Sequence, residues 1–399
     1  MKVLHIEDFF HPNAGYQLNV LAKFMARDGH DVSIITSEME KMPPHLTEFF
    51  GDSNIEREDC EFEKKYNIKI FRVPIYANIS GRSIYKCGSV WNLIDEINPD
   101  VLYVHGSDTY IAIRVFLRMN KFKCTVVSDN HMVDMASANR FRSLFRCAYR
   151  AFITPIIQKY KIPIIHDANI DYIFAHFKIP KQLGPSVSIG TDTMLFHPNE
   201  KKRNAFRNAN GISTEAFLVL YAGKLDENKG GMLLAELTCQ ELRTNTEIVY
   251  VFIGNAIGEY GQSVENLFSK SKYRILRFPT QPYSRLADFY QAADIALIAK
   301  QCSLSLYDFA ATGLPIVAED NETNVNRIKS LGAGKTFASG DVNAFAAAVA
   351  AYANMPDREF MIEKELIAKN AKEQYGYDKQ YKKYISVIKA AIEAQNIQP

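Results

Sequence analysis

Short apolar segments alternate with helical segments along almost the whole chain, and this alternation restricts the fold to few architectures. Residues 2–6 form an apolar segment of strand length, residues 16–25 place apolar side chains on one helical stripe, and residues 31–37 are apolar again. A strand, a helix and a second strand within about 35 residues predict a right-handed βαβ unit. Because such a unit requires a parallel sheet covered by helices, we expect a doubly wound α/β domain.

The alternation continues and then restarts in the second half of the chain. Further strands are predicted at DVLYVHG and CTVVSDNH, each after a predicted helix. The polar, Asn-rich residues 187–211 interrupt the pattern, and we interpret them as an interdomain linker that is irregular after Phe196. The alternation restarts at FLVLYAG, and residues 341–395 are predicted to be helical with breaks near Pro356 and Gly376. Two Rossmann-like domains are therefore expected, with a ligand site in the cleft between them.

Composition excludes several classes of protein. The net charge of +2 argues against a bulk nucleic-acid binder, so no nucleic acid is expected as a partner. The six cysteines are scattered without a Cys-x-x-Cys pair, which predicts neither a disulfide framework nor a zinc site and favours the cytoplasm. The N-terminus does not read as a signal peptide, and no membrane-spanning helix is expected. No Asp-x-Asp occurs, so a carboxylate-held metal ion is not predicted.

Two loops after predicted strands carry residues typical of phosphate sites. Gly15, in HPNAGYQ, either lets the backbone approach a phosphate at a helix N-terminus or forms a plain βα turn. In YAGKLDENKG, Gly223 ends a strand, and Lys224 and Lys229 follow in a polar loop. Two cations at such a loop suit a diphosphate, although two solvated surface lysines would give the same pattern.

The stretch AKQCSLSLYDFAATGLPIVAE, residues 299–319, connects two predicted strands through a helix that begins near Ser305. Its residues QCSLS can present backbone N–H groups to an anion. Asp308, in the first helical turn, either balances the helix dipole or accepts the hydroxyl groups of a ribose. Lys300 stands where a sugar site would be expected to display a second carboxylate.

Three histidines follow predicted strands in the first domain. His131 lies in VSDNHMVD, and His105 and His166 hold similar positions in YVHGSD and IIHDAN. Because the carboxyl ends of parallel strands meet at one edge, we expect these side chains to converge. His131 is then a candidate polar contact to a substrate, and a purely structural hydrogen-bonding role is the alternative.

A basic, aromatic helix is predicted at RFRSLFRCAYRAFI. Arg142, Arg146 and Arg150 recur every four residues, with aromatic side chains between them. Such a helix either rests on an anionic membrane surface or packs on the protein with a solvated basic face.

In their order along the chain, these motifs resemble the retaining glycosyltransferases of family 4, a group with the GT-B fold. SIGTDTMLFHP is similar to the family's Gly-x-Asp-x-x-x-Phe-x-Pro junction, and YAGKLDENKG is similar to its Gly-Arg-…-Lys-Gly motif. LADFYQAADIAL and DFAATGLPIVAED match the C-terminal signature. The resemblance implies an N-terminal acceptor domain, residues 1–195, and a nucleotide-sugar donor domain, residues 196–379. A helix at about 380–399 would pack back on the first domain.

The resemblance also implies the roles of single residues. Lys224 and Lys229 would stabilise the departing diphosphate, and His131 would be the active-site histidine. Separately from the resemblance, the basic, aromatic helix makes Arg142, Arg146 and Arg150 candidate contacts to an acceptor or a membrane. The donor-binding positions are Gly15, Gly223, Thr280, Gln281, Lys300, Ser303, Leu304 and Asp308.

The chain departs from the family pattern at several of these positions. The family's Glu-x7-Glu motif has its first glutamate where this chain has Lys300, and its second glutamate is shortened to Asp308. Lys224 replaces an arginine and cannot form a bidentate fork with phosphate. Lys300 then indicates either an unusual donor, such as one carrying a carboxylate, or weakened catalysis.

We therefore expect a metal-independent hexosyltransferase that uses a UDP- or GDP-linked sugar and no other cofactor. The acceptor would be a glycan or a lipid-linked molecule in surface polysaccharide or glycolipid synthesis. The protein would be cytoplasmic or peripheral at the inner face of the membrane. Two alternatives stay open: a non-catalytic GT-B scaffold or partner protein, and a nucleotide-sugar 2-epimerase.

Overall fold

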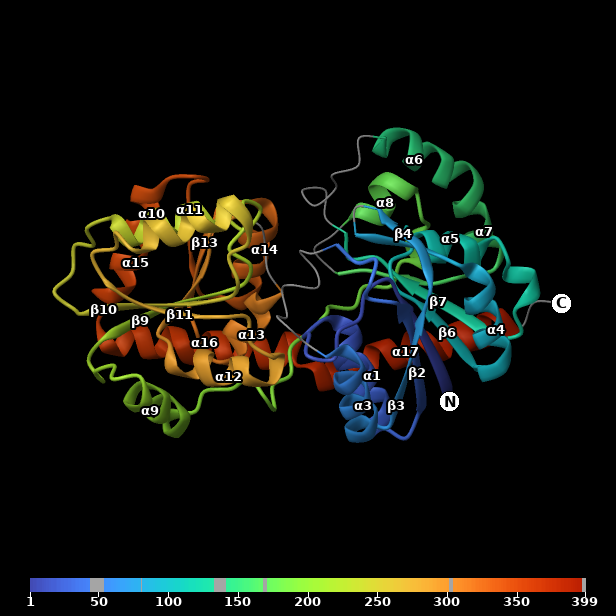
Figure 1. The fold of residues 1–399 in the computed structure, drawn as a ribbon, viewed down its shortest axis with the longest axis horizontal. Helices are drawn as coiled ribbons and strands as arrows, with labels where there is room; N and C mark the ends of the chain where they lie inside the picture. The colour runs from blue at the N-terminus through green and yellow to red at the C-terminus, as the bar shows by residue number, and fades with distance from the viewer. Residues whose placement is uncertain (44–53, 80, 133–140, 168–170, 301–303, 397–399) are drawn as a thin grey trace. The chain divides into compact units, whose positions relative to one another are not determined.

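The computed structural model describes residues 1–43, 54–79, 81–132, 141–167, 171–300 and 304–396 (Figure 1). Within these residues the chain forms two compact units. The first unit runs from Met1 to Ile189 and resumes at Asp378, and the second runs from Gly190 to Tyr377. The chain thus changes unit a few residues before the predicted boundary at residue 195.

The first unit is built on a six-stranded parallel sheet with the order β3-β2-β1-β6-β7-β8. The strand order reverses between β1 and β6, which makes this point the topological switch of the sheet. A separate antiparallel hairpin pairs β4 with β5. The strands are β1 Lys2–Glu7, β2 Asp31–Ser37, β3 Ile68–Val73, β4 Ile75–Ile79, β5 Arg82–Tyr85, β6 Val101–Val104, β7 Thr125–Asp129 and β8 Ile164–Ile165.

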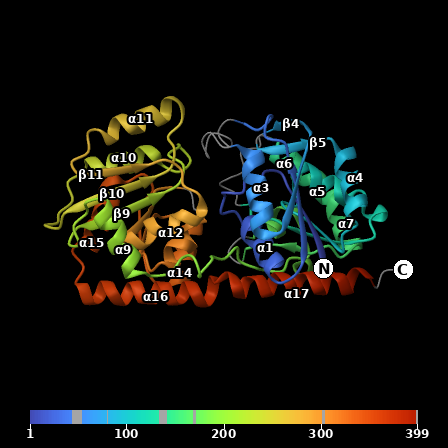
Figure 2. The same cartoon turned by 60° about the horizontal axis from the view of Figure 1, so that its bottom comes forward.

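Helices of this unit include the C-terminal helix α17 (Tyr377–Asn396), which lies along it (Figure 2). There the Gln17 side-chain amide donates to the Tyr384 hydroxyl at 2.8 Å, and the Gln395 amide exchanges two hydrogen bonds with the backbone of Val126. The other helices are α1 Gln17–Arg27, α3 Ile55–Tyr66, α4 Cys87–Ile97, α5 Tyr110–Phe116, η2 Met119–Lys121, α6 Arg142–Ala148, the π-helical η4 Tyr149–Ile153, α7 Thr154–Lys159, α8 Tyr172–Phe177 and η5 Lys181–Leu183.

The second unit repeats the same strand order in a second parallel sheet, β11-β10-β9-β12-β13-β14. Its switch point lies between β9 and β12. The strands are β9 Phe217–Ala222, β10 Ile248–Ile253, β11 Arg274–Phe278, β12 Ile295–Ile298, β13 Ile316–Glu319 and β14 Lys335–Phe337. The helices are α9 Glu200–Ala209, α10 Gly231–Cys239, α11 Gly258–Phe268, α12 Tyr283–Ala292, α13 Ser305–Ala311, α14 Glu322–Leu331, α15 Val342–Ala353 and α16 Asp357–Tyr375.

Two parallel, helix-covered sheets confirm the expected pair of Rossmann-like domains. Every residue of β9 and β10 is buried, because helices cover both faces of a parallel sheet. The predicted breaks in the helical C-terminal region are also confirmed, since α15, α16 and α17 are separated near Pro356 and Gly376.

One expectation about the fold is wrong. The supposedly irregular stretch after Phe196 contains α9, whose N-cap Asn199 accepts a hydrogen bond from the Lys202 N–H. The helix is polar in sequence because it packs partly through charge. Buried Arg207 pairs with Asp294 at 2.7 Å. An apolar residue at this buried position would have marked the helix in the sequence, but an arginine does not.

Candidate functional site

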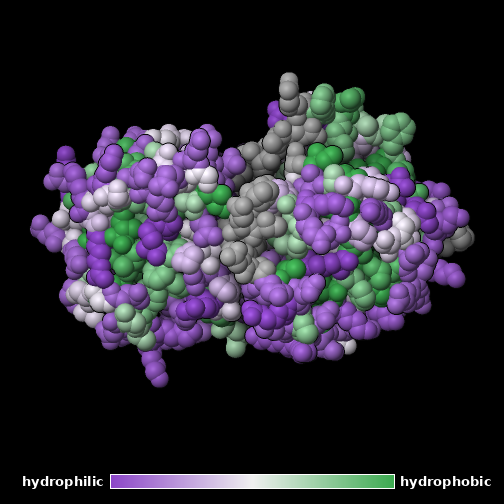
Figure 3. Space-filling view, in the orientation of Figure 1, coloured by the Kyte–Doolittle hydropathy of each residue, from purple (hydrophilic) through white to green (hydrophobic). Residues whose placement is uncertain are grey.

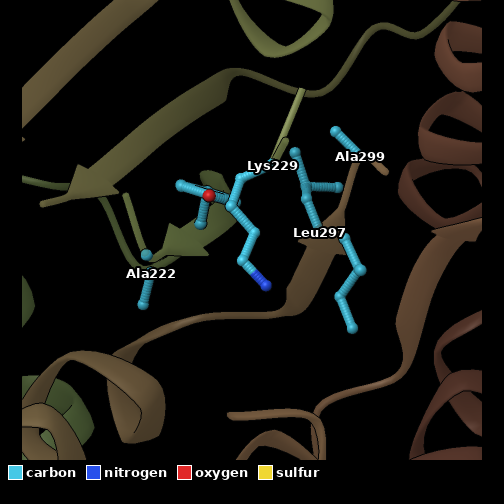
Figure 4. Close-up of a pocket in the computed structure, with 7 residues that line it drawn as sticks. Ala222, Lys229, Leu297 and Ala299 are labelled. Atoms are coloured by element: carbon cyan, nitrogen blue, oxygen red, sulfur yellow. The ribbon is translucent and has the colours of Figure 1, made fainter. Parts of the chain in front are cut away.

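A small pocket opens at the switch point of the second sheet, where β9 and β12 end side by side. Its volume is about 20 Å³, enough for one water-sized group. The Lys229 side chain reaches between the strand ends marked by Ala222 and Leu297 (Figure 4). The pocket is lined by Tyr221, Ala222, Gly223, Lys229, Leu297, Ile298 and Ala299.

Glycines allow the loops around this pocket to approach one another closely. A Cβ atom at Gly254, after β10, would clash with the carbonyl oxygen of Gly223. Gly230 adopts a φ of +76°, and a Cβ atom there would lie 3.1 Å from the Cβ of Ala299. The loop that carries Lys229 is therefore held against the end of β12.

The two predicted lysines lie in this same loop. The Lys229 N–H donates to the Asp226 carboxylate at 2.9 Å, and the Lys224 carbonyl accepts from the Tyr221 hydroxyl at 2.6 Å. Burial lowers the pKa of Lys224, and Asp226 partly offsets that shift. A partly buried ammonium group gains more from an anionic ligand than a solvated one does, because its own hydration is incomplete.

Lys300 is exposed immediately beyond the pocket residue Ala299. Its ammonium group donates to the carbonyl of Glu227 at 3.2 Å, so it contacts the same loop that carries Lys229. Its own carbonyl accepts from the side chain of Asn321. The region therefore presents a cation where the resemblance places a glutamate.

Asp308 lies in α13 and is only 6% exposed. Its Oδ1 accepts hydrogen bonds from the Thr191 hydroxyl at 2.7 Å and the Tyr283 hydroxyl at 3.3 Å. Burial raises the pKa of Asp308 to about 7, and nearby Asp192 adds to the shift while the two hydroxyl donors oppose it. The carboxyl group is thus engaged within the unit, and its role toward a ribose stays a prediction.

Three further predicted donor residues lie in the second unit, and a fourth lies outside the described residues. Thr280 follows β11, and its N–H donates to the Asn255 side chain at 3.1 Å. The Gln281 side chain donates to the carbonyl of Pro279. Leu304 is the N-cap of α13, and Ser303 lies outside the described residues.

In the first unit, two of the three strand-end histidines meet at one carboxylate. His105 Nδ1 lies 2.8 Å from the Asp129 carboxylate, and His131 Nε2 lies 3.9 Å from the same oxygen. His166 instead contacts backbone carbonyls, among them that of Gly184. Gly15 lies in the loop between β1 and α1, in the same unit as His131.

Sequence reasoning missed three titratable residues at this edge, all on or directly after β1. His5 Nδ1 lies 3.0 Å from His105 Nε2, and Glu7 ends the strand. Asp8 is 3% exposed; burial raises its pKa to about 8, and the neighbouring Glu7 contributes to that rise. The available signal was polar and charged side chains in and directly after an otherwise apolar strand.

The predicted basic helix does not present one continuous basic face. Arg146 donates to the Tyr172 hydroxyl at 3.4 Å, and Arg150 donates to the carbonyl of His176 at 2.7 Å, so both contact α8. Apolar side chains are exposed beside them: Phe141, Leu144 and Phe152 are 74%, 71% and 69% exposed. Apolar surface is visible over α6 in Figure 3.

The described residues contain neither a helix able to span a membrane nor a metal-binding cluster of side chains. No helix in this part of the chain is long and apolar enough to cross a membrane. No group of three or more His, Cys, Asp or Glu side chains within the same residues is arranged to hold a metal ion. Metal independence therefore stays a prediction.

Parts of the sequence resemble known proteins. The profile of the family described as Glycosyl transferases group 1 matches residues 202–374. D-inositol 3-phosphate glycosyltransferases 1 and 2 of Catenulispora acidiphila are 26% and 27% identical over 160 and 186 residues, or 37% and 43% of this chain. The match spans only 38% and 43% of the length of those two relatives.

Solved structures resemble the whole chain at low sequence identity. A glycosyltransferase from Rickettsia africae has a TM-score of 0.75 at 12% identity, with 98% of each chain covered. HepE from Anabaena, in complex with UDP and glucose, has a TM-score of 0.70 at 13% identity and covers 98% of this chain and 100% of its own. The chain therefore has the GT-B fold, and its residues 202–374 are similar to the glycosyl transferases group 1.

Proposed function

We propose that the protein is a retaining glycosyltransferase that moves a hexosyl group from a UDP- or GDP-linked sugar to a glycan or lipid-linked acceptor. The observation that carries the proposal is the pocket with Lys229 at the switch point of the second sheet, inside the segment that matches the family. Doubly wound sheets bind nucleotides at this point. An acceptor in surface polysaccharide or glycolipid synthesis fits the family resemblance.

The proposed transfer requires positive charge beside the departing diphosphate. The bond between the anomeric carbon and the phosphate oxygen breaks, and the acceptor oxygen bonds to that carbon. The acceptor proton passes to the departing diphosphate. Lys224, Lys229 and the N-terminus of α10 would stabilise the charge that develops on that diphosphate, and the proposal needs no metal ion.

The comparisons support a nucleotide diphosphate as the donor group. HepE was solved with UDP and with UDP-glucose, and it shares the fold. The two curated relatives are named as inositol phosphate glycosyltransferases, which supports transfer to a hydroxyl group.

The direct test is incubation of the purified protein with a panel of UDP- and GDP-linked sugars and candidate acceptors. Free nucleotide is monitored, and binding of each donor is followed by calorimetry. Saturable binding and acceptor-dependent release of nucleotide are expected for at least one donor. No binding and no release across the panel would overturn the proposal.

The variant Lys229→Ala tests whether this lysine contributes to the transfer. Loss of a cation that stabilises the departing diphosphate should reduce turnover by roughly 100-fold or more. Lys270→Ala is the matched control, since Lys270 is an exposed lysine beyond α11 in the same unit. Equal turnover in the two variants would contradict the assigned role of Lys229.

A non-catalytic scaffold is the second candidate, and two observations favour it. Asp308 is engaged by internal hydroxyl groups, and Lys300 replaces a carboxylate at the pocket rim. A scaffold would bind a donor without turnover. A 2-epimerase would instead change the donor without an acceptor, and product analysis in the absence of acceptor separates all three functions.

We also propose that the face formed by Phe141, Leu144 and Phe152 rests on an anionic membrane at the cytoplasmic side. Exposed aromatic and aliphatic side chains beside arginines are typical of interfacial helices. Arg142 is the arginine best placed to add charge, because Arg146 and Arg150 already contact α8.

Flotation with vesicles that contain anionic lipid tests this face. Replacement of Phe141, Leu144 and Phe152 by serine should abolish binding, and Arg142→Gln should weaken it and reduce its salt dependence. The matched control replaces the exposed apolar residues Met361, Ile362 and Leu366 of α16 by serine. Equal losses in both triple variants, or no binding by the parent protein, would refute the membrane proposal.

A further inference from the structure

Three residues form a closed ring of contacts in the loop that leads into α1. The Asn13 side-chain amide donates to Glu58 Oε2 at 2.9 Å, and His11 Nε2 lies 3.4 Å from the same oxygen. The backbone N–H of Asn13 in turn donates to His11 Nδ1 at 3.2 Å. Glu58 belongs to α3, whereas His11 and Asn13 lie in the loop directly before Ala14 and Gly15. A carboxylate that is distant in the sequence therefore holds the loop that carries Gly15.

These contacts decide which nitrogen of His11 carries the proton. Nδ1 accepts a hydrogen bond from a backbone N–H, so the proton of the neutral ring lies on Nε2, the nitrogen that faces Glu58. An imidazolium could not accept at Nδ1, because both of its nitrogens carry protons. The His11 ring is buried, and burial lowers its pKa to about 4, with a further contribution from the charge of Arg72. His11 is therefore neutral at neutral pH, as the ring of contacts requires.

A second carboxylate of α3 fixes the residue that precedes this ring. Asp59 accepts two hydrogen bonds from the Arg72 guanidinium, at 2.6 Å and 2.9 Å. Arg72 also donates to the carbonyls of Phe10 and Ser37 at 3.2 Å each. The Phe10 ring packs edge-on against Phe62 of α3, with a centroid separation of 5.4 Å. Helix α3 therefore holds the loop at two successive points.

We propose that Glu58 is a positioning residue that fixes residues 11–13 and so holds the backbone at Gly15 in one conformation for the phosphate of a donor. Gly15 is half-buried and Tyr16 is exposed, so the chain is accessible there. Glycine has the greatest backbone freedom of any residue, and a loop that is ordered in advance avoids an entropic cost when a ligand binds. This inference rests on the proposed transferase function only for the identity of the ligand.

Histidine NMR tests the ring of contacts without any assay of activity. The whole chain is labelled with ¹⁵N at histidine, and His11→Asn identifies the His11 signals. In the parent protein the nitrogen shifts should show a neutral His11 ring with its proton on Nε2 at neutral pH. A charged ring, or a neutral ring with its proton on Nδ1, would overturn the proposal.

Two variants of Glu58 separate positioning from a merely structural role. Glu58→Ala should quicken hydrogen exchange at the Asn13 and Ala14 amides and weaken donor binding by roughly 10-fold, because the loop must then be ordered by the ligand. Glu58→Gln keeps an acceptor for Asn13 and should restore both values. Calorimetry gives affinity and stoichiometry separately. A merely structural role would lower the number of binding sites and leave the affinity of the remaining sites unchanged, and that result would contradict the proposal.

Glu61→Ala is the matched control. Glu61 lies on the same helix, is 69% exposed and pairs with Arg57 at 3.6 Å, so its loss should leave the His11 signals and the donor affinity unchanged. Equal effects of Glu58→Ala and Glu61→Ala would refute the role of Glu58. If the His11 signals and loop exchange behave as expected but no UDP- or GDP-linked sugar binds the parent protein, the proposed function fails and the positioning of the loop by Glu58 stands.

Discussion

Asp308 joins the pocket-side helix α13 to the segment where the chain enters the second unit. Its Oδ1 accepts from the Thr191 hydroxyl, and the backbone of Thr191 pairs with Tyr375 and Tyr377 at 2.8 Å each. A residue that the sequence places in a ligand site therefore also stabilises the fold. The raised pKa of this buried carboxyl makes that contribution depend on pH.

Asp308→Asn should remove this pH dependence. The pKa of Asp308 is raised from 3.8 to about 7, so its stabilising contribution is full below the unfolded value and is lost as pH rises through about 7. The amide oxygen of the asparagine side chain would still accept from both hydroxyl groups, and it does not titrate. Melting temperatures at about pH 5 and about pH 8 should therefore favour the variant more at the higher pH. A constant difference between parent and variant would contradict this prediction.

The charge at position 300 should select the donor. Lys300 lies at the rim of the pocket, and Lys300→Glu reverses its charge. If the natural donor carries a carboxylate on its sugar, the variant should lose affinity for that donor by roughly 10-fold and not for the neutral analogue. Calorimetric titration with an acidic and a neutral UDP-sugar measures the ratio. An unchanged ratio would exclude the acidic donor.

Among the secondary-structure elements, α9 shows how charge replaces apolar packing. Asp294 accepts hydrogen bonds from Arg203, from buried Arg207 and from the Leu218 N–H. The helix therefore docks on the sheet through one carboxylate with three donors. Hydrophobic periodicity alone could not reveal this helix, because its buried residue is an arginine.

Asp294→Ala should destabilise the second unit strongly. It leaves the Arg207 guanidinium buried without its counter-charge, at a cost of about 3–5 kcal/mol in the free energy of unfolding. Asp288→Ala is the matched control, because the Asp288–Lys202 pair is half exposed and should contribute only about 0–1 kcal/mol. Urea denaturation measures both variants. Similar losses would show that α9 does not depend on the buried pair.

Across the whole molecule, the same strand order occurs twice, and both candidate sites follow from it. The Lys229 pocket lies at the β9–β12 switch, and the contact between His5 and His105 lies at the β1–β6 switch. Each switch gathers strand ends that are far apart in sequence. His5 and His105, for example, are separated by 100 positions.

Removal of α17 should loosen the first unit alone. A chain that ends at Gly376 loses the contacts of Tyr384 with Gln17 and of Gln395 with the backbone of Val126. Hydrogen exchange should therefore quicken in α1 and β7 and stay unchanged in β9 and β10. A chain that ends at Asn396 is the control. Faster exchange throughout both units would contradict the prediction.

Local sequence patterns were sufficient to predict much of the fold and part of the candidate site. Strand and helix order, both parallel sheets and the loops with Lys224 and Lys229 could be predicted, because hydrophobic periodicity and loop position are properties of neighbouring residues. The internal partners of Asp308, the docking of α9 and the contact between His105 and Asp129 could not. These depend on contacts between distant segments, and burial rather than residue type sets their charge states.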